Sequence, residues 1–160
     1  MPYRWLITGA LIGVGACHLA TGLALRTAAE AGRIMLIFGG VSGMLIAVNP
    51  QHSHTGSVPH VIFSFTGVVL MTLWPIGAMR QEPGAPAALR PRAAWAYEIF
   101  TFALLLWFTA ELFNGSELGL AERAVTADQT IWPLVVVVSA LAARPGPVAA
   151  AQEAAAMRSR

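Results

Sequence analysis

Long apolar stretches constrain the fold of this chain more than any other feature. The clearest covers 93–113, and similar stretches cover 5–25, 34–48 and 60–79. A helix needs about 20 mostly apolar residues to cross the hydrocarbon core of a bilayer. Because lipid offers backbone N–H and C=O groups no hydrogen-bond partner, segments of this kind must be helical. The sequence therefore predicts an all-α integral membrane protein, a bundle of transmembrane helices.

A fifth helix is expected near 127–143, although its purely apolar part starts only at Ile131. That part is too short to cross alone, so the helix must extend back past Gln129 and Asp128. These two polar residues are then expected at the membrane interface. Trp132 would lie at headgroup depth, where tryptophan is enriched. The sequence thus predicts about five membrane crossings.

Short connections indicate a single transmembrane bundle over 1–144. The segment 80–92 contains three prolines and a glycine, which predicts a non-helical linker. The segment 114–125 carries glycines and mixed charges and is interpreted as a loop. The Ala-rich segment 145–160 lacks the apolar variety needed to pack, so we expect a disordered or weakly helical cytoplasmic tail.

The distribution of charge predicts an orientation. All ten basic residues are arginines, and only Arg4 and Arg123 fall on one side of the predicted topology. The other side collects Arg26, Arg33, Arg80, Arg90, Arg92, Arg144, Arg158 and Arg160. The positive-inside rule then predicts a cell inner (plasma) membrane protein with its amino terminus outside and its carboxyl terminus in the cytoplasm. The arginines form no cluster of the kind that binds nucleic acid, so no nucleic-acid partner is expected.

Four ionisable residues are expected near the outer face. Glu111 lies within a span, where an ionisable side chain suggests a function by default, although it also fits an interfacial carboxylate in contact with water. His60 opens the third helix and serves either as a structural tie or as a functional group. Together with Glu122 and Arg123, these residues form a candidate pocket for an anionic headgroup or for acid/base chemistry.

A weak metal hypothesis rests on His52, His54 and His60, which fall within nine residues of one another. Neutral imidazole is the commonest transition-metal ligand. A zinc site needs three or four protein ligands, however, and no cysteine lies near these histidines. The histidines of the loop are therefore interpreted either as solvated side chains or as metal ligands, and no cofactor is identified.

Two further ionisable residues are assigned structural roles. His18 is the one ionisable residue expected at mid-membrane depth, and it is interpreted as a packing histidine. Glu98, beside Trp95 and Tyr97, is expected to extend toward water at the cytoplasmic interface.

Small residues four apart predict close helix packing. The two pairs are Gly9 with Gly13, and Gly39 with Gly43. Such pairs serve packing within one chain or dimerisation, so a homo-oligomer or a larger membrane complex stays open.

Three stretches resemble an uncharacterised bacterial and archaeal membrane family, the domain of unknown function 998. They are Gly9–Arg26 with its ending Gly22-Leu23-Ala24-Leu25-Arg26, then Asn49-Pro50 followed by His60, and then Gly119-Leu120-Ala121-Glu122-Arg123 followed by Trp132-Pro133. The resemblance spans 5–143 and implies a six-helix bundle without an established activity. The first helix of this chain is similar to the second helix of the family pattern, so a leading helix is expected to be absent. The resemblance implies functional roles for His60, Glu122 and Arg123, and Asn49 is a further ligand-binding candidate.

Three functions remain open. The first is an accessory bundle that interacts with membrane lipid or a small ligand through a polar pocket on the extracytoplasmic face. The second is an intramembrane enzyme that acts on a lipid or isoprenoid headgroup through His60 with Glu111 or Glu122. The third is a small transporter, which is disfavoured because transporters usually carry more polar groups at mid-membrane than His18 alone.

Overall fold

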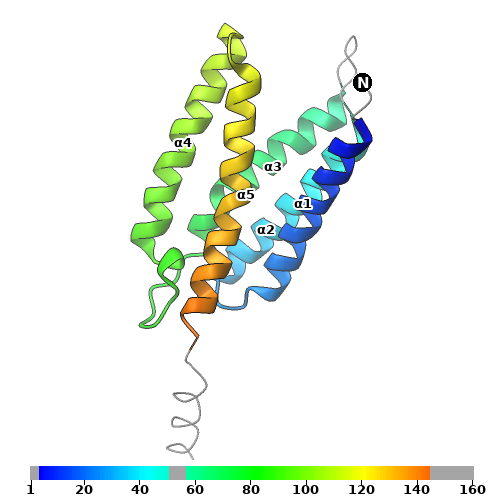
Figure 1. Ribbon diagram of the computed structural model, residues 1–160. Coiled ribbons are helices and arrows are strands. Elements are labelled where there is room, and N and C mark those ends of the chain that lie inside the picture. Colours follow the sequence, from blue (N-terminus) through cyan, green and yellow to red (C-terminus); the bar gives the residue numbers. More distant parts are fainter. Residues whose placement is uncertain (1–3, 51–56, 145–160) are drawn as a thin grey trace, which may run out of the picture.

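The computed structural model describes residues 4–50 and 57–144, and these form five long helices with one short 3-10 turn (Figure 1). All five long helices have the length and apolar composition needed to cross a membrane, as predicted. The chain is thus a multi-pass, all-helical membrane protein. The helices are α1 (Arg4–Ala24), α2 (Glu30–Val48), α3 (Val58–Gly77), α4 (Pro91–Asn114) and α5 (Leu118–Ala142), with the turn η1 (Ala87–Leu89) before α4.

The largest difference from the predicted elements concerns the start of α5. The helix begins at Leu118, nine residues before the predicted 127, so most of the expected loop 114–125 is helical. In this first part of α5, Ala121 and Val125 are buried on one side of the helix, while Glu122 and Arg123 are exposed. The two buried residues give the start of α5 a short apolar face for packing, and its polar residues lie on the remaining, exposed surface. This amphipathic pattern is sufficient for a helix.

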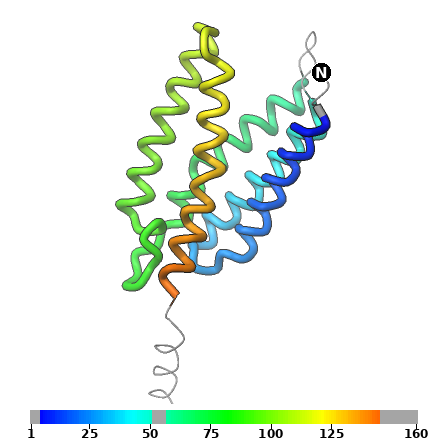
Figure 2. Tube along the Cα trace, in the orientation of Figure 1, coloured from blue at the N-terminus to red at the C-terminus, as the bar shows by residue number. Residues whose placement is uncertain are grey.

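The five helices form two units (Figure 2). Helices α1, α2 and α3 pack closely side by side, and we call them the three-helix unit. Helices α4 and α5 form an antiparallel hairpin. The units approach each other where α1 and α3 end and α4 begins, and they diverge toward the α4–α5 turn (Figure 1).

The end where the two units meet is called the arginine-rich end. Its described arginines are Arg26, Arg33, Arg80, Arg90, Arg92 and Arg144. The largest apolar cluster lies toward this end and includes Trp74, Leu89 and Val136. The Ser139 hydroxyl accepts a hydrogen bond from the backbone N–H of Ala88 at 3.1 Å, so α5 is attached to the segment before α4.

Glycines explain the close packing of the three-helix unit. A Cβ atom on Gly15 would lie 2.6 Å from the carbonyl oxygen of Gly40, and a Cβ atom on Gly40 would lie 2.6 Å from the carbonyl oxygen of Gly15. Only residues without a side chain allow the two backbones to come this close. The predicted pair Gly9 and Gly13 is different, because neither position has a neighbour within 4 Å of an added Cβ. The close approach of α1 and α2 therefore uses other glycines than the predicted pair on α1.

Candidate functional site

His60 and Asn49 are brought together, as part of a tie between α2 and α3. The Nδ1 atom of His60 lies 2.9 Å from the carbonyl oxygen of Asn49. A carbonyl only accepts, so Nδ1 carries the proton and donates in this bond. The side-chain amide of Asn49 in turn donates from Nδ2 to the carbonyl oxygen of Leu45 at 2.8 Å. Of the two interpretations of His60, the structural tie has a direct hydrogen bond behind it.

Glu111 organises the α4–α5 turn. Its Oε2 atom accepts from the Ser116 hydroxyl at 3.1 Å and from the backbone N–H of Glu117 at 2.8 Å. The side chain is only 9% exposed. The first N–H groups of a helix have no partner within the helix, so a carboxylate just before α5 stabilises its start. Glu111 thus has a structural task at this turn.

The predicted outer-face residues do not share one described cluster. Glu122 and Arg123 are exposed on α5, close to the turn that Glu111 organises. His60 lies in the first turn of α3, and Figure 1 shows this end of α3 beside the start of α1, away from the α4–α5 turn. Hydrogen bonds link His60 to Asn49, and Glu111 to its own turn, but none joins these two groups within the described ranges.

The metal hypothesis lies partly outside the described residues, because His52 and His54 fall in 51–56. Within 4–50 and 57–144, no three His, Cys, Asp or Glu side chains are grouped so as to hold a metal ion. His60 donates from Nδ1 to a backbone carbonyl, which leaves its Nε2 atom as the acceptor.

A polar cluster joins α4 to α5 in the interior of the hairpin. The Oδ2 atom of Asp128 accepts from the Tyr97 hydroxyl at 3.0 Å and from the Thr101 hydroxyl at 2.8 Å. The ring of Tyr97 stacks on Trp132 with centroids 4.1 Å apart. Because α5 starts at Leu118, Asp128 lies about 15 Å along the helix from its first residue. That Asp128 lies at the membrane interface stays a prediction, and its carboxylate contacts α4.

Glu98 lies beside this cluster and is buried, with an exposed fraction of 1%. Neither of its carboxylate oxygens has a hydrogen-bond partner in the structure. The prediction that Glu98 extends to water at the interface is wrong, because its position on α4 faces the neighbouring helices. The buried residues Ala94, Tyr97, Glu98 and Thr101 are spaced as one helix face, and this spacing was the signal available in the sequence.

A groove runs between α1 and α5, on the side of α5 away from α4. One cavity of about 590 Å³ is lined by small and apolar residues together with His18, Thr21 and Thr130. His18 is 8% exposed and makes no hydrogen bond within the described part of the chain. His18 is buried where α1 meets α2, since a Cβ added to Gly40 would lie 3.0 Å from its Cβ. This burial agrees with the interpretation as a packing histidine, and the residue also lines the groove.

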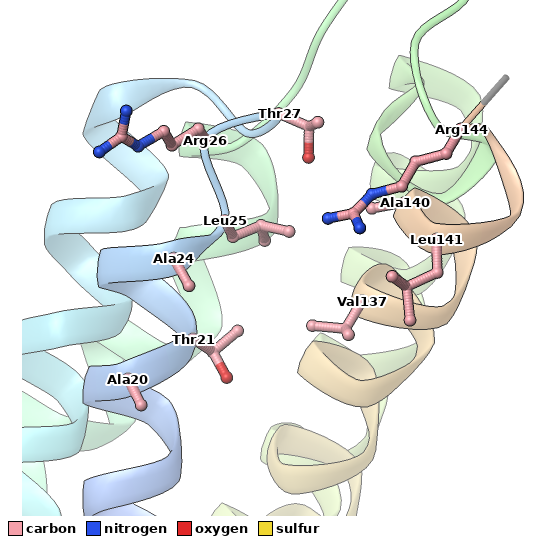
Figure 3. Close-up of a pocket in the computed structure, with 10 residues that line it drawn as sticks. All are labelled: Ala20, Thr21, Ala24, Leu25, Arg26, Thr27, Val137, Ala140, Leu141 and Arg144. Atoms are coloured by element: carbon pink, nitrogen blue, oxygen red, sulfur yellow. The ribbon is translucent and has the colours of Figure 1, made fainter. Parts of the chain in front are cut away.

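A second cavity of about 500 Å³ continues the groove to the arginine-rich end, because both cavities are lined by Thr21 and Val137. Arg26 and Arg144 both line this end. Arg144 extends from the end of α5 across the gap toward the α1–α2 loop, whereas the Arg26 guanidinium points away from the gap (Figure 3). The groove therefore has the Arg144 guanidinium at one end, Arg26 on the rim beside it, and an apolar interior.

Comparison with known proteins bears on the family rather than on the activity. No curated protein and no solved structure matches the chain. A family model described as "Protein of unknown function (DUF998)" matches residues 1–139, which is most of the chain. With this match and the five spanning helices, the chain belongs to the DUF998 family of membrane proteins, as the short motifs of its sequence predicted.

Proposed function

We propose that this protein is a lipid-interacting membrane bundle, and that an anionic phospholipid occupies the groove between α1 and α5. The carrying observation is the continuity of two cavities, one lined by Arg26 and Arg144 at its end and one with an apolar interior. An anionic headgroup complements the Arg144 guanidinium in the gap, and Arg26 on the rim adds positive charge at the same end. An acyl chain suits walls made mainly of alanine, valine and leucine side chains.

The depth of the groove supports a lipid rather than a soluble ligand. Along α1, Thr21 lies about 4.5 Å and His18 about 9 Å before Ala24, the last residue of the helix, and Arg26 lies in the loop beyond it. A molecule that reaches both the arginines and the deeper cavity must therefore be polar at one end and apolar over most of its length. Membrane lipids have this shape.

The orientation forms part of the same proposal. We propose that the arginine-rich end faces the cytoplasm in the plasma membrane, with the amino terminus outside, by the positive-inside rule. Anionic lipids concentrate in the cytoplasmic leaflet, where each nearby arginine contributes about 1 kcal/mol of attraction. The pocket proposed here thus lies on the opposite face from the extracytoplasmic pocket that the sequence suggested.

The extracytoplasmic pocket and the enzyme hypothesis receive less support. Both need His60 to act with Glu111 or Glu122, yet His60 and Glu111 are engaged in separate hydrogen-bonded ties. The transporter hypothesis gains one argument, because the bundle contains two ionisable groups in addition to His18, namely Glu98 and Asp128 between α4 and α5. Accessory, homo-oligomeric or larger assemblies remain compatible with a lipid in the groove.

Native mass spectrometry of the full chain, extracted from its membrane in mild detergent, tests the proposal. The wild-type protein should retain an anionic phospholipid. The double variant Arg26→Gln/Arg144→Gln should lose about 30-fold in affinity, since about 1 kcal/mol is lost for each arginine. The matched control is Arg92→Gln, which removes an exposed arginine from the same end without touching the groove.

The outcomes are distinct. Retention of a lipid in the wild type and the control, with loss in the double variant, supports the proposal. Equal retention in all three proteins overturns it, because the lipid would then be bound elsewhere. A dimer whose interface masks α1 and α5 would also overturn it and would assign the groove to a second copy of the chain.

A further inference from the structure

The interior of the hairpin contains two carboxyl groups in very different surroundings. Asp128 has two hydroxyl donors on its Oδ2 atom, at 2.8 and 3.0 Å. Glu98 is 1% exposed, and neither of its oxygens has a partner. The two carboxyl groups are close enough to interact electrostatically. This arrangement lies on the opposite side of α5 from the lipid groove and is independent of it.

Among residues 4–50 and 57–144, no cation forms an ion pair with Glu98. The ion pair found within the described ranges joins Arg80 to Glu82, at the exposed linker. Arg90, just before α4, donates from Nε to the carbonyl oxygen of Ala85. Arg92, which lies six residues before Glu98, is exposed.

The facing helices offer Glu98 no positive charge. On α5 the nearby ionisable group is Asp128, which is itself acidic. On α3 the one ionisable residue is His60, at the far end of the helix. The Gln129 side chain, which bridges α5 to α3, donates to the Thr72 hydroxyl at 3.1 Å.

An ionised carboxylate without a partner is costly in such a place. Moving a charge out of water costs several kcal/mol even after relaxation, and a second negative charge nearby adds to the cost. Donated hydrogen bonds favour the charged form of a carboxyl group, and Asp128 has two of them. Of the two acids, Glu98 is therefore the one for which the charged form is more costly.

We propose that Glu98 is a proton-binding site in the membrane interior, where it and Asp128 together hold one proton at neutral pH. The bound proton neutralises Glu98, whose oxygens receive no hydroxyl donors of the kind that Tyr97 and Thr101 provide to Asp128. Deprotonation would place two negative charges in the hairpin, so proton release is coupled to the packing of α4 against α5. Such coupling is a means by which a membrane bundle responds to pH or passes protons.

The first test uses dicyclohexylcarbodiimide, an apolar reagent that adds to undissociated carboxyl groups. The full chain in lipid vesicles is treated over a range of pH, and the adducts are located by peptide mass spectrometry. We expect an adduct at Glu98 at neutral pH that disappears as the pH rises. The exposed Glu122 should remain unlabelled and serves as the internal control.

The variant Asp128→Asn sharpens the test, because it removes the neighbouring negative charge while keeping the side-chain shape. The pH at which half of the labelling is lost should fall by about one unit. Added Na⁺ at constant pH should leave the labelling unchanged. Protection by Na⁺ would overturn the proton assignment in favour of a metal cation.

A stability measurement tests the proposal without any reagent. A group that binds a proton more tightly in the folded state gives stability that is lost as the pH rises. Wild-type melting temperature in detergent should therefore fall between neutral and alkaline pH. In Glu98→Gln, whose amide mimics the neutral acid, this fall should be absent and the variant should fold normally. An identical pH dependence in both proteins, together with no adduct at Glu98, would overturn the proposal.

Discussion

The three-helix unit and the α4–α5 hairpin are held together in opposite ways. In the three-helix unit the contact depends on missing side chains, as where Gly15 and Gly40 face each other. In the hairpin the contact depends on polar side chains, as where Tyr97 and Thr101 donate to Asp128. Lipid is as apolar as leucine, so burying apolar residues does not drive helices together in a membrane. Close backbone packing and hydrogen bonds between helices are the two remaining means. The first acts where α1 meets α2, and the second acts in the interior of the hairpin and in the tie from His60 to Asn49 between α2 and α3.

The strongest test of the three-helix unit is Gly40→Ala. The new Cβ would lie 2.6 Å from the backbone carbonyl oxygen of Gly15, which cannot rotate away, so α1 and α2 must separate. Overpacking of this kind costs about 1–3 kcal/mol. The free energy of unfolding in mixed detergent micelles measures the loss.

Gly43→Ala is the matched control for that variant. It lies on the same helix, and an added Cβ there has nothing within 4 Å. Both variants gain the same helix propensity, about 1 kcal/mol, so the difference between them isolates packing. Equal stability of the two variants would contradict the role given to the glycine contact.

The hairpin is tested by Thr101→Val, which removes a hydroxyl at nearly constant shape. Asp128 then loses one of its two donors, and we expect a loss of about 1 kcal/mol in the free energy of unfolding. Thr109→Val is the control, because the Thr109 hydroxyl bonds only the carbonyl oxygen of Leu105 in its own helix. If both variants lose the same stability, the hydrogen bond between the helices is not what holds the hairpin.

The smallest effect is expected for Arg33→Met, at the arginine-rich end. Arg33 donates from Nε to the carbonyl oxygen of Gly22 at 2.9 Å, and from Nη2 to that of Leu23 at 3.1 Å. A cation at the end of a helix contributes about 0.3–1 kcal/mol, so we expect a loss of about 0.5 kcal/mol. Chemical denaturation in detergent, with Arg92→Met as the exposed control, is sensitive enough to detect it. If the denaturation midpoint of Arg33→Met equals that of the wild type, Arg33 does not stabilise the fold, and its charge would serve only the orientation of the protein in the membrane.

The contrast between the units also explains which predictions succeeded. The spacing of glycines within one helix did not indicate the contact between Gly15 and Gly40. Which glycine makes a close contact depends on the residue that faces it from the neighbouring helix. Thr101 and Asp128 lie on different helices, and no spacing within one helix shows that they meet. Glu98 was assigned to the interface from its neighbours Trp95 and Tyr97, whereas its burial depends on α5 and α3.

Sequence alone determined the number of spans, the ends at which arginines gather and the family. These features depend on the composition of single segments, and a segment of about 20 apolar residues must be a helix in lipid whatever surrounds it. Only the tertiary structure decided which polar groups meet, where the groove lies and that Glu98 has no partner. In water the apolar face of a helix indicates its buried side, but in lipid both sides are apolar. The orientation of each helix about its own axis, and with it every site, therefore depends on the neighbours that it packs against.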